Sequence, residues 1–310
     1  LKGELTLGGL IAFRILSSYV TTPILRLTSL WQNFQETLIS LERLSDVINN
    51  PKEEEIMDTD LPPFTIEKGN IEYKKVSFSF YDDNQLQIRN ISLKINAGDF
   101  IGIIGKSGSG KSTILKLLSR FYPINTGKIE IDGYDISKVN LYSLRYQIGL
   151  VSQDSLLFDG TLKENISLSR PDASLDEVIE AAKIACADEF IQDLPLSYNT
   201  NVGEKGSNLS GGQRQRISIA RMILSDPKII ILDEATSALD FDTETRLLKN
   251  LIEKYKNTTI LFITHRINSL INADKIFLIH NGLIDEQGNH QELLKMNGRY
   301  KNLISEQRIK

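Results

Sequence analysis

The stretch Gly105–Ser112, which reads GKSGSGKS, limits the possible folds of this chain more than any other part of its sequence. It matches the pattern G-x-x-x-x-G-K-[ST], whose glycines let backbone N–H groups wrap a phosphate. The apolar segment FIGII precedes it as a strand, and STILKLLSR follows it as a helix. Because the N-terminus of a helix favours an anion, this context strengthens the assignment. The sequence therefore predicts a strand, a phosphate-binding loop and a helix in succession.

Two side chains at the end of this loop complete its chemistry. In this pattern Lys111 reaches the β- and γ-phosphates of a nucleotide, and Ser112 offers its hydroxyl to Mg²⁺. The alternative, a glycine-rich turn that binds nothing, is disfavoured by the flanking strand and helix.

Short strands and helices alternate from residue 71 onward. The predicted strands are Ile71–Phe80, Ile88–Ile95, Phe100–Ile104, Ile148–Val151, Ile229–Leu232, Ile260–Ile263 and Ile276–Ile279. The last four are continuous apolar runs, as strands buried in a parallel sheet require. Helical patterns lie between the strands, for example at Ser112–Arg120, Leu175–Ala185, Ser210–Leu224 and Thr243–Lys256. This alternation predicts an α/β fold.

The N-terminal part has a different pattern. Residues Leu5–Trp31 are largely apolar, and only Arg14 and Arg26 interrupt them. A membrane-spanning helix needs about 20 apolar residues, but a central arginine is costly, so hydropathy alone leaves a buried soluble helix open. Further apolar residues continue at helical spacing (Leu27, Leu30, Phe34, Leu38, Leu41, Leu44 and Ile48) until Pro51. The pattern predicts one long helix that could leave a membrane and enter the cytosol.

The segment Pro51–Pro63 is acidic and without periodicity, which predicts a linker. The chain begins at Leu1 and shows no signal-peptide pattern, so we expect it to be a fragment of a longer protein.

Composition excludes several classes of protein. The 310 residues carry 36 Lys and Arg against 40 Asp and Glu, a net charge of −4, which argues against a protein that coats nucleic acid. The single cysteine, Cys186, rules out an intrachain disulfide framework and a multi-cysteine zinc site. A reducing, cytosolic setting fits most of the chain.

A second acidic motif lies at the end of a predicted strand, where Ile229–Glu234 reads IIILDE. Open α/β sheets bind ligands at the carboxyl ends of their strands. There Asp233 would hold Mg²⁺, directly or through water, and Glu234 would activate water for attack on the γ-phosphate. Alone, two acids after an apolar run could be a solvated strand end, but the phosphate loop makes the pair informative.

The pentapeptide Leu209–Gln213, LSGGQ, opens another helix. Ser210 is a favourable N-cap, and Gly211 and Gly212 let backbone amides approach a phosphate closely. The motif predicts a second anion-binding helix N-terminus, although an ordinary capped helix would read the same.

The combination of GKSGSGKS, LSGGQ and IIILDEATSALD resembles the nucleotide-binding domain of ATP-binding cassette (ABC) proteins over residues 66–310. This resemblance implies a P-loop NTPase fold of ABC type, with a mostly parallel core sheet, an antiparallel β subdomain and a helical signature subdomain. It also implies that ATP and Mg²⁺ are the cofactors. The implied ATP-binding residues are Phe80, Gly105, Ser107, Gly108, Gly110, Lys111, Ser112, Thr113, Ser210, Gly211, Gly212, Gln213 and Asp240.

The same resemblance assigns further roles. Gln153 would sense Mg²⁺ and the attacking water. The implied metal-site residues are therefore Ser112, Asp233 and Gln153, and Gln153 joins Glu234 as an implied catalytic residue. Ser237–Asp240, SALD, would be the D-loop, which crosses a dimer interface. His265 would be the switch histidine that contacts the γ-phosphate.

The family stacks adenine on an aromatic residue, commonly Tyr, after its first strand. Phe80 stands at that place and Tyr81 follows it. We assign the stacking to Phe80, which has no hydroxyl but can still stack, and Tyr81 remains the alternative.

Residues Asn199–Gly206, with Glu204 near the coupling helices, resemble the exporter form of the family. Residues 1–55 resemble the last transmembrane helix and cytosolic extension of type I secretion exporters of haemolysin-type polypeptides. That outline is shared with lipid and drug exporters. The resemblance implies that Leu5–Leu25 spans the membrane, with Arg14 facing the bundle interior or a water-filled path.

We therefore expect three parts: a transmembrane helix with its extension (1–50), a linker (51–65) and a nucleotide-binding domain (66–310). The implied protein hydrolyses ATP on the cytoplasmic face of the cytoplasmic (inner) membrane to export a substrate, most readily a polypeptide. Its implied partners are a second protomer in a homodimer, its own upstream transmembrane domain and, in type I secretion, a periplasmic adaptor and an outer-membrane channel.

Three other functions fit less well. A lipid or small-molecule exporter stays open, because the helices that would select the substrate are absent. A soluble repair-type ABC ATPase needs a coiled-coil insertion that Gly105–Asp233 does not contain, and the cluster Arg214, Arg216 and Arg221 is read as structural rather than as a nucleic-acid site. A degenerate, binding-only domain would not need both Glu234 and His265.

Overall fold

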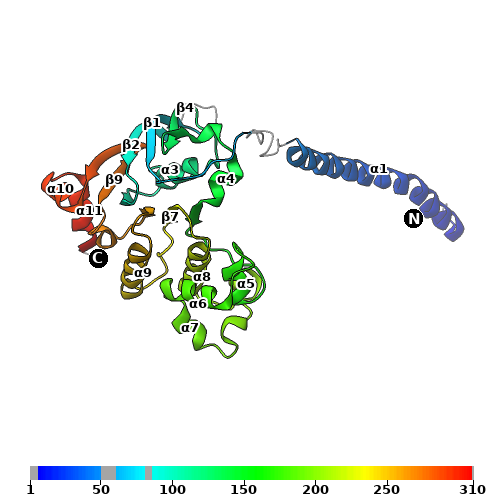
Figure 1. The fold of residues 1–310 in the computed structure, drawn as a ribbon. Coiled ribbons are helices and arrows are strands. Elements are labelled where there is room, and N and C mark those ends of the chain that lie inside the picture. Colours follow the sequence, from blue (N-terminus) through cyan, green and yellow to red (C-terminus); the bar gives the residue numbers. More distant parts are fainter. Residues whose placement is uncertain (1–5, 50–60, 81–85, 309–310) are drawn as a thin grey trace. The chain divides into compact units, whose positions relative to one another are not determined.

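The computed structural model describes residues 6–49, 61–80 and 86–308. The chain divides into two compact units, Leu1–Asp58 and Thr59–Lys310 (Figure 1). Most of the predicted linker, including residues 51–60, lies outside the described residues.

The described part of the first unit forms helix α1, Leu7–Ile48, whose N-cap Thr6 accepts a hydrogen bond from Gly9 N. None of its 42 residues is buried in the structure. The hydroxyls of Ser18 and Thr21 donate to main-chain oxygens one turn earlier, which satisfies polar groups inside an apolar segment. An 18-residue window reaches a mean hydropathy of 1.3, so α1 is long and apolar enough to cross a membrane. The predicted long N-terminal helix is confirmed.

The second unit contains two sheets. The first has six strands in the order β10-β9-β3-β8-β7-β6, and only the β9–β10 pair is antiparallel. Its strands are β3 (Phe100–Ile104), β6 (Ile148–Val151), β7 (Ile229–Asp233), β8 (Thr259–Ile263), β9 (Lys275–His280) and β10 (Leu283–Gly288). The second sheet is antiparallel with the order β2-β1-β4-β5. It comprises β1 (Ile71–Phe78), β2 (Ile88–Ile95), β4 (Thr126–Ile131) and β5 (Tyr134–Asp135).

Helices α5 to α8 gather into a largely helical part, shown in green to yellow in Figure 1. The helices of this unit are α3 (Lys111–Leu118), α4 (Leu141–Tyr146), α5 (Leu162–Ser167), α6 (Leu175–Ile184), α7 (Asp188–Gln192), α8 (Gly211–Leu224), α9 (Phe241–Lys254), α10 (His290–Lys295) and α11 (Arg299–Arg308). Short 3₁₀ turns lie at Ile136–Lys138 (η1), Ser197–Asn199 (η2), Glu204–Gly206 (η3) and Ile267–Leu270 (η4).

Two hydrophobic cores lie on opposite faces of the six-stranded sheet. Along β7, Ile229 and Ile231 belong to the core shared with α3 and the antiparallel sheet, whereas Ile230 and Leu232 belong to the core shared with α8 and α9. Successive strand residues point to opposite faces, so a strand buried on both sides must be apolar at every position. This explains the continuous apolar runs, and the predicted α/β fold with a mostly parallel core sheet, an antiparallel β part and a helical part is confirmed.

Candidate active site

The phosphate loop connects the buried strand β3 to α3. A Cβ atom on Gly105 would lie 2.2 Å from the Ile279 carbonyl oxygen, so only glycine fits there. Gly108 has a φ of 76° and open space around its would-be Cβ, and Gly110 has a φ of 104°. These left-handed conformations favour glycine. They leave the side of the loop at Gly108 open to a ligand.

Lys111 is buried at the first position of α3. Its Nζ donates to the carbonyl oxygens of Gly105 at 2.9 Å and Lys106 at 3.0 Å. Burial lowers the pKa of Lys111, while the nearby carboxylates of Glu234 and Asp233 act in the opposite direction. The ammonium group therefore lies inside the loop, where an anion held by the loop amides would meet it.

The start of α3 fits an anion. Within the described residues, its N-cap Gly110 provides no side-chain cap for the first amides. The buried Ser109 Oγ also has no hydrogen-bond partner there, and such atoms in folded proteins call for a ligand or water. Ser107 is exposed in the same loop, and Thr113 is buried in the first turn of α3. The loop, its lysine and this uncapped helix start fit a phosphate group.

Ser112 in the first turn of α3 and Asp233 at the end of β7 face each other. Ser112 Oγ donates to Asp233 Oδ1 at 2.9 Å. Burial raises the pKa of Asp233, and the hydrogen bond from Ser112 opposes that rise. A hydroxyl and a carboxylate oxygen suit Mg²⁺, which usually takes one or two protein ligands and completes its shell with phosphates and water.

Glu234 and His265 form a close pair. His265 follows β8, and its Nε2 lies 2.5 Å from Glu234 Oε1. The Glu234 side chain is 17% exposed and that of His265 is 53% exposed. Glu234 adopts a φ of 52°, a left-handed conformation that costs a non-glycine residue about 1–2 kcal/mol, and its N–H donates to the Ile263 oxygen at 3.0 Å. The structure thus brings the two predicted catalytic residues together at the end of neighbouring strands.

Gln153 lies in the segment that follows β6 and is exposed. Its main-chain oxygen accepts a hydrogen bond from Gln215 Nε2 at 3.4 Å. With Gln215, Glu204, Gly211 and further residues, Gln153 lines a groove of about 740 Å³. Gln153 and the exporter-type segment around Glu204 therefore lie beside one another.

The LSGGQ motif starts α8 with a reciprocal cap. Ser210 Oγ accepts from Gln213 N at 3.2 Å, and Gln213 Oε1 accepts from Ser210 N at 2.8 Å. A Cβ atom on Gly211 would lie 3.3 Å from Ala238 Cβ, and one on Gly212 would lie 2.8 Å from the Ala238 oxygen. The glycines thus let the SALD segment pack directly on the helix start.

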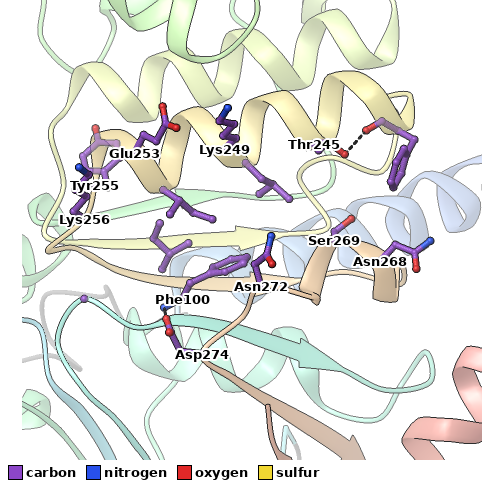
Figure 2. Close-up of a pocket in the computed structure, with 15 residues that line it drawn as sticks. Phe100, Thr245, Lys249, Glu253, Tyr255, Lys256, Asn268, Ser269, Asn272 and Asp274 are labelled. Carbon is purple, nitrogen blue, oxygen red and sulfur yellow. Dashed lines mark hydrogen bonds between the residues drawn. The ribbon is translucent and has the colours of Figure 1, made fainter. Parts of the chain in front are cut away.

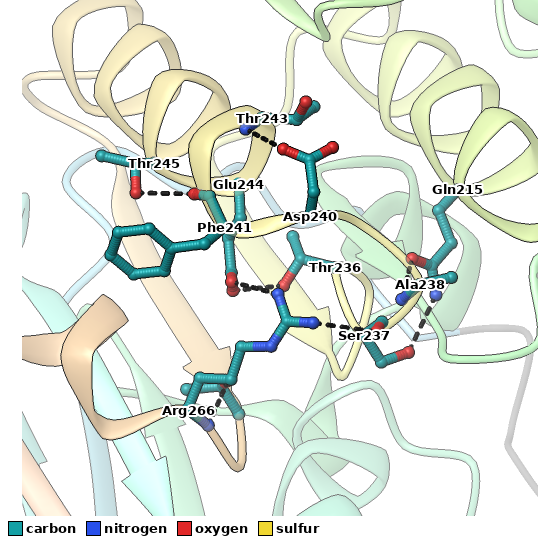
Figure 3. Close-up of polar contacts among 11 residues, drawn as sticks. Gln215, Thr236, Ser237, Ala238, Asp240, Phe241, Thr243, Glu244, Thr245 and Arg266 are labelled. Carbon is teal, nitrogen blue, oxygen red and sulfur yellow. Dashed lines mark hydrogen bonds and ion pairs between the residues drawn. The ribbon is translucent and has the colours of Figure 1, made fainter. Parts of the chain in front are cut away.

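Asp240, at the end of that segment, is the N-cap of α9, and its Oδ1 accepts from Thr243 N at 2.8 Å (Figure 3). The hydrogen bond from the Thr243 amide lowers the pKa of Asp240. Its carboxylate is therefore turned toward its own helix.

Phe80 is exposed and belongs to an aromatic cluster with the buried Phe78 and the exposed Tyr122. Its ring packs edge-on against Phe78 at 4.9 Å and against Tyr122 at 5.2 Å between centroids. The alternative stacking residue, Tyr81, lies outside the described residues. Sequence reasoning missed Tyr122, which lies far from Phe80 along the chain.

Sequence reasoning also missed a polar network beside the SALD segment, formed by Gln215, Thr236, Glu244 and Arg266 (Figure 3). One signal was available. Glu244 lies on the same helix face as the buried Leu247, Leu248 and Leu251. A carboxylate on the apolar face of an amphipathic helix indicates a buried polar contact.

A separate pocket of about 500 Å³ lies between α9, the amino ends of β3 and β8, and the region around η4 (Figure 2). Phe100, Leu248, Ile252 and Ile260 are among its apolar lining residues. None of the candidate site residues lines it, so it is distinct from the phosphate loop.

Comparisons with known proteins give a consistent result. Residues 88–237 match a family model described as ABC transporter, and residues 170–309 match one described as P-loop domain. The alpha-hemolysin translocation ATP-binding protein HlyB of Escherichia coli O157:H7 is 47% identical over 95% of this chain and 41% of its own length. The leukotoxin export ATP-binding protein LtxB of Aggregatibacter actinomycetemcomitans is 45% identical over 95% of this chain and 41% of its own.

Among solved structures, a bacterial Atm1-family ABC exporter with ATP bound matches 99% of this chain and 53% of its own chain, with a TM-score of 0.81 and 36% identity. The chain spans about two fifths of the length of the curated relatives that it matches.

Proposed function

The chain belongs to the ABC transporter family and carries that family's ATP-binding domain, and from this premise we propose that it powers the export of a polypeptide by hydrolysing ATP. One observation carries the proposal of hydrolysis rather than binding alone. Glu234 Oε1 and His265 Nε2 lie 2.5 Å apart, next to the Ser112–Asp233 pair. A carboxylate base held by a second polar side chain is the arrangement that activates an attacking water.

The residues of this site have separable roles. The loop amides and Lys111 hold the phosphates, Ser112 and Asp233 would hold Mg²⁺, Gln153 would sense Mg²⁺ and the attacking water, and Phe80 or Tyr81 would stack on adenine. Bound Mg²⁺ would neutralise charge on the β- and γ-phosphates. Glu234 accepts the proton of the attacking water, and His265 orients that carboxylate and contacts the γ-phosphate.

The complete site requires a second protomer. The body of α3 packs in the core on one face of the six-stranded sheet, and the body of α8 packs in the core on the other face. We infer that the start of α8, with Ser210, Gly211, Gly212 and Gln213, binds the ATP held by the loop of a partner, and that Asp240 lies at that interface. A homodimer supplies two such sites with one sequence.

The exposed apolar helix α1 supports a membrane location. We place Leu5–Leu25 in the cytoplasmic membrane and the ATP-binding unit on its cytoplasmic face, following an upstream transmembrane domain. We take residues 51–65 as the linker and 66–310 as the ATP-binding domain. The names of the two toxin-exporting relatives favour a polypeptide cargo, and a periplasmic adaptor and an outer-membrane channel would then complete the export path.

The proposal is tested in the source organism by replacing Glu234 with Gln in the full-length gene. Proteins in the culture medium are compared by quantitative mass spectrometry, and ATP hydrolysis is measured on the purified protein. We expect hydrolysis to be lost and specific polypeptides to disappear from the medium. Lost hydrolysis with an unchanged set of secreted polypeptides would favour a lipid or small-molecule exporter instead.

A further inference from the structure

The carboxylate of Glu244 is almost fully buried, although it lies outside the phosphate-binding loop and the catalytic pair. Its side chain is 1% exposed on α9. Burying an ionised carboxylate is costly unless it is paired and hydrogen-bonded. A buried charge at this position therefore needs an explanation in terms of its partners.

Both oxygens of Glu244 are engaged, each by a different segment. Oε1 accepts from Thr236 Oγ1 at 2.7 Å, and Oε2 accepts from Arg266 Nη1 at 2.7 Å. Arg266 also donates through Nη2 to the Ser237 oxygen at 3.3 Å. Figure 3 shows the guanidinium group between Glu244 and the SALD segment. One carboxylate thus joins α9, the segment after β7 and the segment after β8.

These partners stand next to the catalytic pair. Arg266 directly follows His265, and Thr236 lies two residues after Glu234. The contact between Glu244 and its two partners therefore fixes the segments that carry both members of the pair. It acts from the side of α9, away from Lys111 and the loop.

The other side of the SALD segment is held by α8. Gln215 donates to Ser237 Oγ at 3.0 Å and accepts from Ala238 N at 3.0 Å, and it also reaches the oxygen of Gln153. Two side chains thus hold the SALD segment: Arg266, which is itself bound by Glu244 of α9, and Gln215 of α8. Through these hydrogen bonds the SALD segment links α8, which starts with the LSGGQ motif, to the segment that carries His265.

We propose that Glu244 is a positioning residue for ATP hydrolysis: through Thr236 and Arg266 it holds Glu234, His265 and the SALD segment in one arrangement. This inference rests on the proposed function. Glu244 does not touch the reacting atoms, so it acts on the rate of the chemical step and not on the affinity for ATP. The Arg266 side chain is 39% exposed and that of Glu244 is 1% exposed, so Arg266 links the buried carboxylate to the surface, where a second protomer would meet the SALD segment.

The test compares Glu244→Gln with the wild-type full-length protein purified in lipid nanodiscs. Glutamine keeps the shape and one acceptor oxygen but removes the charge that pairs with Arg266. We expect kcat to fall on the order of tenfold, since a small displacement of a reacting group has effects of that size or larger. The ATP dissociation constant should stay within about twofold of the wild-type value, and the thermal midpoint should stay within a few degrees. The matched control is Glu253→Gln, which makes the same change on the exposed side of α9 and should leave kcat unchanged.

A double-mutant cycle decides whether Glu244 acts through Arg266. Arg266→Gln changes a partly exposed side chain, so it provides a second variant that does not depend on the buried position. If the two residues act as one contact, the double variant loses no more activity than the stronger single variant. Losses that multiply, an unchanged kcat in Glu244→Gln, or a parallel fall of kcat, ATP affinity and thermal midpoint would each overturn the positioning role. A wild-type protein that does not hydrolyse ATP would overturn the proposed function instead.

Discussion

The amides at the start of α3 and those at the start of α8 are held in different ways. At α3 the N-cap is Gly110, which contributes no side-chain bond, and the neighbouring Ser109 Oγ is buried without a partner among the described residues. At α8, Ser210 and Gln213 cap each other's amides within the chain. Both segments read as phosphate-binding helix starts in the sequence, but only the second has two of its amides capped by side chains of the chain itself.

This difference assigns different energetic roles to the two motifs. The loop at α3 gains new hydrogen bonds when a phosphate arrives, so it should carry most of the affinity for ATP. At the start of α8 two amides are already satisfied by the reciprocal cap, so this segment should gain less from a free nucleotide and contribute mainly when a partner presents ATP. We therefore expect the loop to govern binding and chemistry, and the LSGGQ motif to govern assembly.

The largest expected effect lies beside the loop, at Glu234. Glu234→Gln removes the base but keeps the phosphate and metal ligands, so turnover should fall about 10²- to 10⁴-fold while ATP stays bound. Phosphate release and nucleotide affinity are measured on the same preparation. Unchanged steady-state hydrolysis would take Glu234 out of its catalytic role.

The next effect is on affinity. Lys111→Ala removes a buried cation from the loop, and the loss of a charged hydrogen bond corresponds to an ATP affinity that is roughly 10- to 100-fold lower. Calorimetry gives the affinity directly. Lys106→Ala is the matched control, because Lys106 is an exposed lysine in the same loop. Equal affinity for wild type and Lys111→Ala would contradict the role given to the loop.

The third prediction separates assembly from binding. Ser210→Arg places a bulky side chain where backbone amides must approach the γ-phosphate of a partner. In the unit Thr59–Lys310 carrying Glu234→Gln, we expect ATP affinity within about twofold of the parent and ATP-driven dimerisation at least about tenfold weaker. Light scattering with and without ATP measures the dimer. Equal dimerisation of the two forms would show that the site is not shared between protomers.

The smallest effect compares two serines directly. Ser210→Ala removes a helix cap and should lower the free energy of unfolding by about 1 kcal/mol. Ser109→Ala removes a buried hydroxyl that has no partner, so it should cost nothing in the absence of nucleotide. Urea unfolding of the unit Thr59–Lys310 without ATP measures both. Equal losses for the two variants would remove the distinction between the two helix starts.

Local patterns were sufficient to predict the parts of the site that are formed by consecutive residues. The loop at Gly105–Ser112 and the cap at Ser210 depend on backbone conformation and on partners three residues away, which the sequence displays. The α/β fold was predicted in the same way from the apolar runs, because strands that are buried on both faces are continuous apolar segments in the sequence.

The missed features depend on residues that are distant in the chain. Glu244 meets Arg266 because β8 returns the chain past α9, and Phe80 meets Tyr122 across two different elements. Nothing in the spacing of these residues specifies such contacts. Strands β4, β5 and β10 were also missed, since their exposed positions leave little apolar signal.

The left-handed backbone at Glu234 has a consequence for directed evolution. Glycine or asparagine would adopt its φ of 52° at lower cost than glutamate. A selection that scores only soluble, heat-resistant protein would therefore enrich Gly or Asn at this position and discard the base. Stabilised libraries of this domain should be screened for turnover from the first round, because the substitution that most relieves the backbone would remove the proposed catalytic base.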